Sequence, residues 1–244
     1  MSAPWLQHVL AVMLAAAVPV WDRVETRRVK RSSDVHARVQ SYRRVVAVLW
    51  GLSALALAAM PPKDLLHPPA LGGPFARLDT APGVAVPIVA ALLAGLAVPV
   101  LVGLASPSAR ARLAKPLEAL SWYLPNSLAE RRWFAAVAVS AGVCEEVLYR
   151  GFLLRYLTAL LPGLGGTGAV LVAALVFALA HTYQGPLGSV ATALLALGFT
   201  ALFVASHALW LPIVVHALVD LRVLLLWRGD SRGAGTATAD ASTG

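Results

Sequence analysis

The chain has 244 residues, of which 59% are hydrophobic and only 13% are charged, and its formal net charge is +8. Its mean hydropathy is +0.73. A soluble domain of this size needs far more polar surface than this composition supplies, so the chain is expected to be an integral membrane protein. The positive charge could indicate a nucleic-acid partner, but it is concentrated between apolar segments, and we expect no nucleic acid to bind.

Apolar segments recur along the chain, and most of them reach or approach the roughly 20 residues that a spanning helix needs. In chain order they are Ala3–Trp21, Val45–Met60, Gly83–Ala105, Trp133–Leu161, Gly165–Thr182, Pro186–Ser206 and His207–Trp227. The second segment is short, but Arg43 and Arg44 can lengthen it by snorkelling to the interface. The pattern predicts an all-α fold, a polytopic bundle of transmembrane helices with about seven spans (six to eight).

The basic residues predict how the bundle is oriented. Residues 22–44 carry eight Lys/Arg against three acids, residues 106–132 carry five against two, and residues 61–82 carry two of each. The positive-inside rule therefore places 22–44 and 106–132 in the cytoplasm as loops, and the N-terminus outside. The first segment lacks a basic region before it, which favours a retained anchor over a cleaved signal peptide. Lysine occurs only at positions 30, 63 and 115, an arginine-rich usage that suggests a bacterial cytoplasmic membrane.

Three regions are expected along the chain. Residues 1–132 hold the N-terminal spans with their basic loops, residues 133–228 hold spans that contain charged groups, and residues 229–244 form a small, polar and disordered tail. Residues 113–134 mix apolar and basic side chains and predict a partly interfacial helix. The one cysteine, Cys144, is interpreted as a small buried residue rather than a nucleophile.

The segment "GVCEEVLYRGFLLRYL", residues 142–157, places three charges in an apolar span. On a helix Glu146 and Arg150 are four residues apart with the acid first, which favours an ion pair. Glu145 is rotated by about 100° from Glu146 and has only Leu148 and Tyr149 at the positions where a partner would stand. A carboxyl without a partner in an apolar site is available as a general acid or base. The alternative is a charge cluster that only joins two helices.

Two later spans carry further polar groups at the same spacing. Phe177 and His181 stand four residues apart in "FALAH", and His216 and Asp220 do so in "HALVD". Each pair alone is compatible with a structural hydrogen bond, and His207 is a weaker candidate than His216. Three spans that each contribute groups suited to proton transfer or metal binding nevertheless predict one hydrophilic site that activates water within the membrane.

In this order the motifs "EEVLYR", "FALAH" and "HALVD" match EExxxR, FxxxH and HxxxN/D over Trp133–Trp227. The chain here resembles the CAAX prenyl endopeptidase and bacteriocin-processing family, or CPBP family, of intramembrane proteases, also called abortive-infection-type. The resemblance makes residues 133–228 a CPBP-like catalytic helical core. It implies an endopeptidase that acts on a membrane-associated protein or peptide within the lipid bilayer.

The resemblance also implies a role for each matched residue. Glu145 and His181 would activate the water that attacks the scissile carbonyl, and His216 and Asp220 would lie beside the developing oxyanion or position the water. The residues expected to support them are Glu146, Arg150, Phe177 and Tyr149. The last motif of the family often ends in Asn, which can donate a hydrogen bond to an oxyanion, whereas an ionised Asp220 cannot. Asp220 is therefore protonated, or it orients His216, or other groups stabilise the oxyanion.

A metal-dependent reaction is an alternative. Glu145, His181 and His216 would form a two-histidine, one-carboxylate set of the kind that binds hydrolytic zinc. The chain has no HExxH motif, and we favour a metal-free glutamate mechanism without a cofactor. Two other classes of function stay open. One is a non-catalytic membrane scaffold or immunity-type protein, and the other is a proton-coupled transporter, for which the chain lacks the expected repeated halves.

Overall fold

The computed structural model describes residues 4–32, 34, 36–80 and 82–228. Within these ranges every regular element is a helix, which confirms the all-α prediction. Five helices are long and apolar enough to cross a membrane. They are Pro4–Arg31, Ala37–Ala59, Val86–Ala105, Pro162–Leu179 and Thr182–Ser206. The predicted disordered tail, residues 229–244, lies outside the described residues.

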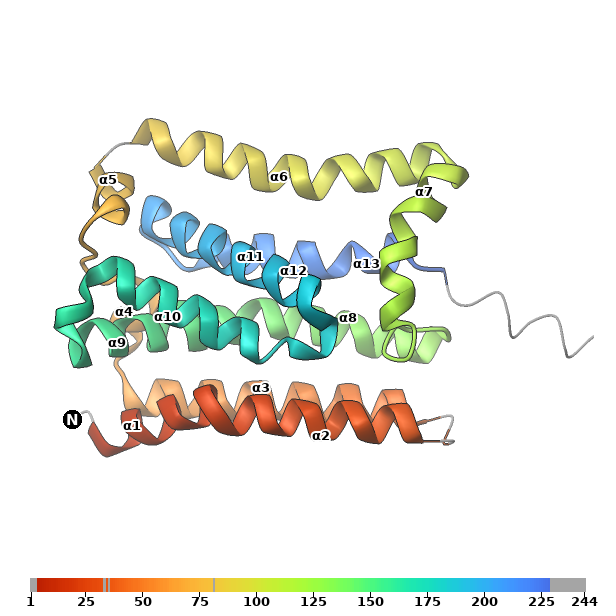
Figure 1. Cartoon of the computed structure of the whole chain (residues 1–244), viewed down its shortest axis with the longest axis horizontal. Helices are drawn as coiled ribbons and strands as arrows, with labels where there is room; N and C mark the ends of the chain where they lie inside the picture. Colours follow the sequence, from red (N-terminus) through yellow and green to blue (C-terminus); the bar gives the residue numbers. More distant parts are fainter. Residues whose placement is uncertain (1–3, 33, 35, 81, 229–244) are drawn as a thin grey trace, which may run out of the picture.

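The N-terminal part is a pair of long antiparallel helices (Figure 1). Its first member is continuous from α1 (Pro4–Val12) through a π-helical turn, η1 (Met13–Ala17), to α2 (Val18–Arg31), and the second is α3 (Ala37–Ala59). The prediction of a loop over residues 22–44 is therefore wrong for most of that range. Basic side chains at the ends of spanning helices reach the interface, so a helix can continue past its apolar part.

The segment that follows covers both ends of the bundle and one of its sides. The helices α4 (Pro62–Leu66) and α5 (Pro74–Thr80) lie at one end, and α6 (Pro82–Ala105) crosses to the other along α11, with most of its surface exposed. There α7 (Pro107–Ala114) and the 3₁₀ helix η2 (Lys115–Leu120) run across the end. The single interfacial helix predicted for residues 113–134 is thus broken, since Pro125 lies in the turn that follows η2.

The central helix begins at α8 (Leu128–Glu145) and continues through the π-helical η3 (Glu146–Leu153) into α9 (Leu154–Leu160). A capping box starts it, because the Ser127 hydroxyl accepts from the Glu130 amide and the Glu130 carboxylate accepts from the Ser127 amide. α8 packs against α3 on one side and against α12 on the other. This helix therefore carries Glu145 and Glu146 through the middle of the molecule.

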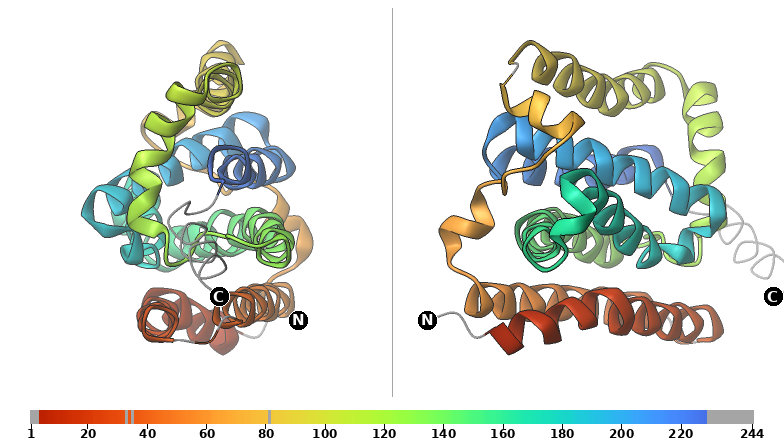
Figure 2. Two further views of the ribbon diagram at one scale, coloured as in Figure 1. Left: turned by 90° about the vertical axis from the view of Figure 1, so that its right-hand side faces the viewer. Right: turned by 60° about the vertical axis from the view of Figure 1, so that its left-hand side comes forward.

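The C-terminal helices complete the bundle around α8. The 3₁₀ turn η4 (Pro162–Leu164) leads into α10 (Gly165–Leu179), which packs against α11 (Gly185–Ser206) as a hairpin, closed by the 3₁₀ turn η5 (Thr182–Gln184). α12 (Trp210–Leu221) and α13 (Val223–Leu226) then return along α8. With α8–α9 and α12–α13 beside the five candidate spans, the arrangement is consistent with about seven spans (Figures 1 and 2).

One end of the bundle collects the basic parts of the chain. The end of α2, the start of α3, the helix α7 and the end of the described chain at residue 228 lie together (Figure 1). This is the arrangement that the positive-inside rule requires of the two basic regions. The α10–α11 turn stops short of that end, because the 15 residues of α10 extend only about 22 Å. The turn therefore lies inside the bundle.

Candidate active site

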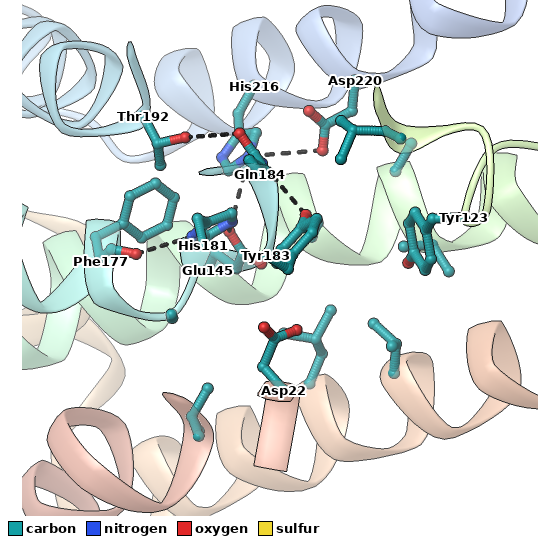
Figure 3. Close-up of a pocket in the computed structure, with 18 of the residues that line it drawn as sticks. Asp22, Tyr123, Glu145, Phe177, His181, Tyr183, Gln184, Thr192, His216 and Asp220 are labelled. Atoms are coloured by element: carbon teal, nitrogen blue, oxygen red, sulfur yellow. Dashed lines mark hydrogen bonds and ion pairs between the residues drawn. The ribbon is translucent and has the colours of Figure 1, made fainter. Parts of the chain in front are cut away.

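A cavity of about 300 Å³ lies between the N-terminal helix pair and the C-terminal helices. It is lined by residues of α2, α3, α8, α11, α12 and the two turns that close over it, 117–124 and 180–184 (Figure 3). The site residues predicted from the sequence that line it are Tyr149, Phe177 and the four proposed catalytic residues, Glu145, His181, His216 and Asp220. The fold thus brings all three motifs to one cavity.

Glu145 faces both histidines. Its Oε2 lies 3.8 Å from Nε2 of His181 and 3.9 Å from Nε2 of His216. These distances are too long for direct hydrogen bonds, and Oε2 is buried without a hydrogen-bond partner. A polar oxygen held between two ring nitrogens at this spacing can share a water molecule with them.

Glu146 is turned away from the cavity and into the protein. Its side chain is 0% exposed and that of Arg150 is 2% exposed, and Oε1 of Glu146 lies 2.9 Å from Nη1 of Arg150. The predicted ion pair is therefore present, although the local helix is a π-helix instead of the expected α-helix. The same Oε1 lies 2.7 Å from Nδ1 of His216. Glu146 thus joins the central helix to α12 and fixes the ring of His216.

The orientation of His181 follows from its own turn. Its Nδ1 donates to the carbonyl of Phe177 at 2.8 Å. With the proton on Nδ1, the neutral ring leaves Nε2 as an acceptor toward Glu145. Glycine is required directly after this turn, because Gly185 has a φ of 79°. The motif FxxxH therefore positions a ring nitrogen instead of merely filling space.

Aromatic rings pack against Arg150 and His216. The guanidinium of Arg150 lies 4.6 Å from the ring centre of Phe177 and 5.3 Å from that of Phe199. Phe177 packs edge-on against Tyr149 at 4.8 Å, and His216 stacks on Phe199 at 4.9 Å. These rings surround the acids and the histidines with apolar groups. Electrostatic interactions among the charged side chains are stronger in such an environment.

Asp220 lies at the edge of the site. Its Oδ2 is 3.7 Å from Nε2 of His216, and its side chain is 37% exposed, far more than the other members of the cluster. Because Glu146 already bonds Nδ1 of His216, the orienting role considered for Asp220 is taken by Glu146. Asp220 lines the cavity together with Arg222, which directly follows the end of α12.

Several polar residues of the cavity were missed from the sequence. Thr192 donates to Gln184 at 3.1 Å, and Gln184 donates to the hydroxyl of Tyr183 at 3.2 Å. Tyr123 enters from the turn that covers the end of the cavity, and burial raises its pKa well above the ordinary value, so its hydroxyl stays protonated. Asp22 lies on the opposite wall (Figure 3). In the sequence Asp22 is an acid within a basic segment, and that segment, residues 22–44, was predicted to be a loop.

The residues of the alternative zinc set lie around this cavity. Among the described residues, no three His, Cys, Asp or Glu side chains are placed to hold a metal ion. The alternative zinc set of Glu145, His181 and His216 stays a prediction. Nδ1 of each histidine is bonded within the protein, so Nε2 is the ring nitrogen that a water molecule or a metal ion would contact.

Comparison with known proteins identifies part of the chain. Residues 127–222 match a family model described as type II CAAX prenyl endopeptidase Rce1-like. The matched range contains all three motifs, and over these residues the predicted family is confirmed. No curated protein and no solved structure matches the chain.

Proposed function

Since residues 127–222 belong to the type II CAAX prenyl endopeptidase-like family of membrane proteases, we propose that the chain is an intramembrane endopeptidase. It hydrolyses a peptide bond of a membrane-associated protein or peptide, in a bacterial cytoplasmic membrane. One observation carries the proposal. An unbonded carboxylate oxygen of Glu145 faces the Nε2 atoms of two histidines in a cavity between apolar helices.

The first step is activation of water. A water molecule between Glu145 and His181 donates one hydrogen bond to the carboxylate and one to Nε2 of His181, whose Nδ1 proton is held by Phe177. Glu145 removes a proton as the water oxygen attacks the scissile carbonyl carbon. Proton transfer by a positioned side chain contributes about 10²- to 10⁴-fold to a rate.

The second step stabilises and resolves the tetrahedral intermediate. His216, protonated on both ring nitrogens, donates from Nε2 to the oxyanion and from Nδ1 to Glu146, which holds the ring in place. The carbon–nitrogen bond then breaks, and Glu145 returns its proton to the leaving nitrogen. The oxygen of the water remains in the new carboxyl group, so one water is consumed for each bond cut. No metal takes part in these steps.

We place the substrate entrance at the basic end of the bundle. The turn 117–124 lies at this end (Figure 1), and the α10–α11 turn that carries His181 lies deeper, inside the bundle. Entry here requires the turn 117–124 to move aside, because it covers the end of the cavity. A peptide that leaves the membrane at this side can therefore reach Glu145 without crossing the whole bilayer.

The proposal is tested with purified protein in liposomes that contain membrane proteins of the host. New peptide termini are compared between the wild type, Glu145→Gln and Glu118→Gln, the last an exposed glutamate of η2 as a matched control. We expect new termini with the wild type and Glu118→Gln, with or without a metal chelator, and none with Glu145→Gln. Termini that Glu145→Gln still produces would refute the assigned base, and loss of activity with the chelator would refute the metal-free reaction.

A further inference from the structure

The helix α2 presents opposite charges on two faces. Asp22 and Glu25 are three residues apart and line the cavity, which places them on one face of the helix. Its cations Arg23, Arg27 and Lys30 instead line a separate hollow outside the cavity. In a chain with a formal net charge of +8, this helix turns its only two acids inward.

The two acids differ in their partners. Glu25 is neutralised by Arg44, at 2.6 Å, and lies 3.8 Å from Arg28. Asp22 has no cation within ion-pair distance among the described residues, and its Oδ2 is buried without a hydrogen-bond partner. A buried carboxylate without a partner is costly in an apolar surrounding. Asp22 is therefore the acid on this wall that lacks a counter-charge.

Asp22 faces the proposed catalytic residues across the cavity. Figure 3 shows its carboxyl directed from α2 toward Glu145 and His181, and both carboxyls line the same cavity. A second carboxyl at this place repels the first unless a cation joins them. The cavity has room for a side chain, since its volume is about 300 Å³.

Resting on the proposed protease function, we propose that Asp22 binds a Lys or Arg side chain of the substrate close to the scissile bond. The turn 117–124, which covers one end of the cavity, lies at the basic end of the bundle, which the charge distribution assigns to the cytoplasm. Segments that flank the cytoplasmic ends of membrane spans are enriched in Lys and Arg for the same reason. A cation paired with Asp22 compensates the buried acid and fixes the register of the peptide against Glu145.

The test uses purified protein in liposomes with a library of peptides. Each peptide has one membrane anchor followed by a randomised segment and an acetylated N-terminus, and cleaved bonds are located by mass spectrometry. The variants are Asp22→Asn, Asp22→Lys and Thr26→Val, the last an uncharged change one turn further along the same wall. A parallel library with free N-termini separates a preference for the terminal amine from one for a side chain.

We expect Lys or Arg to be enriched at one position near the bonds that the wild type and Thr26→Val cleave. Asp22→Asn lowers the ratio of cationic to neutral residues there by roughly tenfold, and Asp22→Lys favours Asp or Glu at that position instead. Equal enrichment with Asp22→Asn, no enrichment with the wild type, or a preference confined to free N-termini would overturn the inference and leave the protease function standing. No cleavage of any peptide by the wild type would refute both.

Discussion

Nδ1 of His216 lies 2.7 Å from Oε1 of Glu146, although 70 residues separate them in the chain. The same oxygen lies 2.9 Å from Nη1 of Arg150. One buried carboxylate thus accepts a hydrogen bond from a histidine of the proposed site and forms an ion pair with a buried arginine. Glu146 therefore links the stability of the bundle to the position of the catalytic groups.

Removing Glu146 leaves Arg150 buried without its counter-charge. We expect Glu146→Leu to destabilise the folded protein by about 3–5 kcal/mol, measured by thermal or denaturant unfolding in detergent. The double variant Glu146→Leu/Arg150→Met removes both charges and recovers most of that loss. Hydrolysis is not recovered, because His216 still lacks its acceptor. A single variant as stable as the wild type, or a double variant no more stable than the single, would contradict this account of the pair.

His181 contributes to the reaction more than to folding. Its one hydrogen bond from Nδ1 is to the Phe177 carbonyl, so we expect His181→Ala to cost about 1 kcal/mol of stability. The rate of hydrolysis falls by about 10²- to 10⁴-fold, because the water loses its second partner. His67→Ala is the control, since the exposed ring of His67 donates to the carbonyl of Lys63 in its own turn, and the bond from Arg155 to the His67 carbonyl survives the change. Activity of His181→Ala within tenfold of the wild type would contradict the role of the ring.

Asp220 is the position at which the last motif often carries Asn. Because Asp220 does not bond Nδ1 of His216, its carboxylate is not needed to orient the ring. We expect Asp220→Asn to hydrolyse substrate at least as fast as the wild type, since an amide can donate to the oxyanion and a carboxylate cannot. Asp220→Leu is expected to be slower than both. If Asp220→Asn instead falls more than tenfold below the wild type, the carboxyl itself takes part in the reaction.

Gly142 sets the distance between α8 and α12. A Cβ at this position would lie 2.8 Å from both Cβ and the backbone nitrogen of Ala217, the neighbour of His216. Gly142→Ala therefore pushes α12 away, at a cost of about 1–3 kcal/mol, and moves His216 with it. The unfolding temperature and the rate of hydrolysis are both expected to fall. Gly95→Ala has open space around its new methyl group and should change neither. Equal behaviour of the two variants would show that the close approach is unimportant.

The spacing of charged residues along one helix was sufficient to predict which of them form an ion pair. The pair of Glu146 and Arg150 follows from a spacing of four residues, and it holds even where the helix widens to a π-helix. The hydropathy pattern was likewise sufficient for an all-α bundle, because spanning helices must be apolar over most of their length. The order of the three motifs was sufficient to predict the family that residues 127–222 match.

Contacts between distant helices could not be predicted in the same way. The bond from His216 to Glu146 depends on how α12 packs against α8, and no spacing in one helix encodes it. Asp22 was missed because its charged neighbours suggested a loop, whereas the helix continues to Arg31 with the acids on one face. A single sequence shows which residues carry charge, but the opposite wall of a cavity is set by tertiary packing.

The central claim is that Glu145 supplies the base for cutting a peptide bond within the membrane. The most direct measurement compares protein termini in the membranes and medium of a host that carries the wild type with those of a host that carries Glu145→Gln at equal expression. The account predicts termini that are present with the wild type and absent with the folded variant, each identifying a substrate. Identical sets of termini, with both proteins folded and present in the membrane, would contradict it.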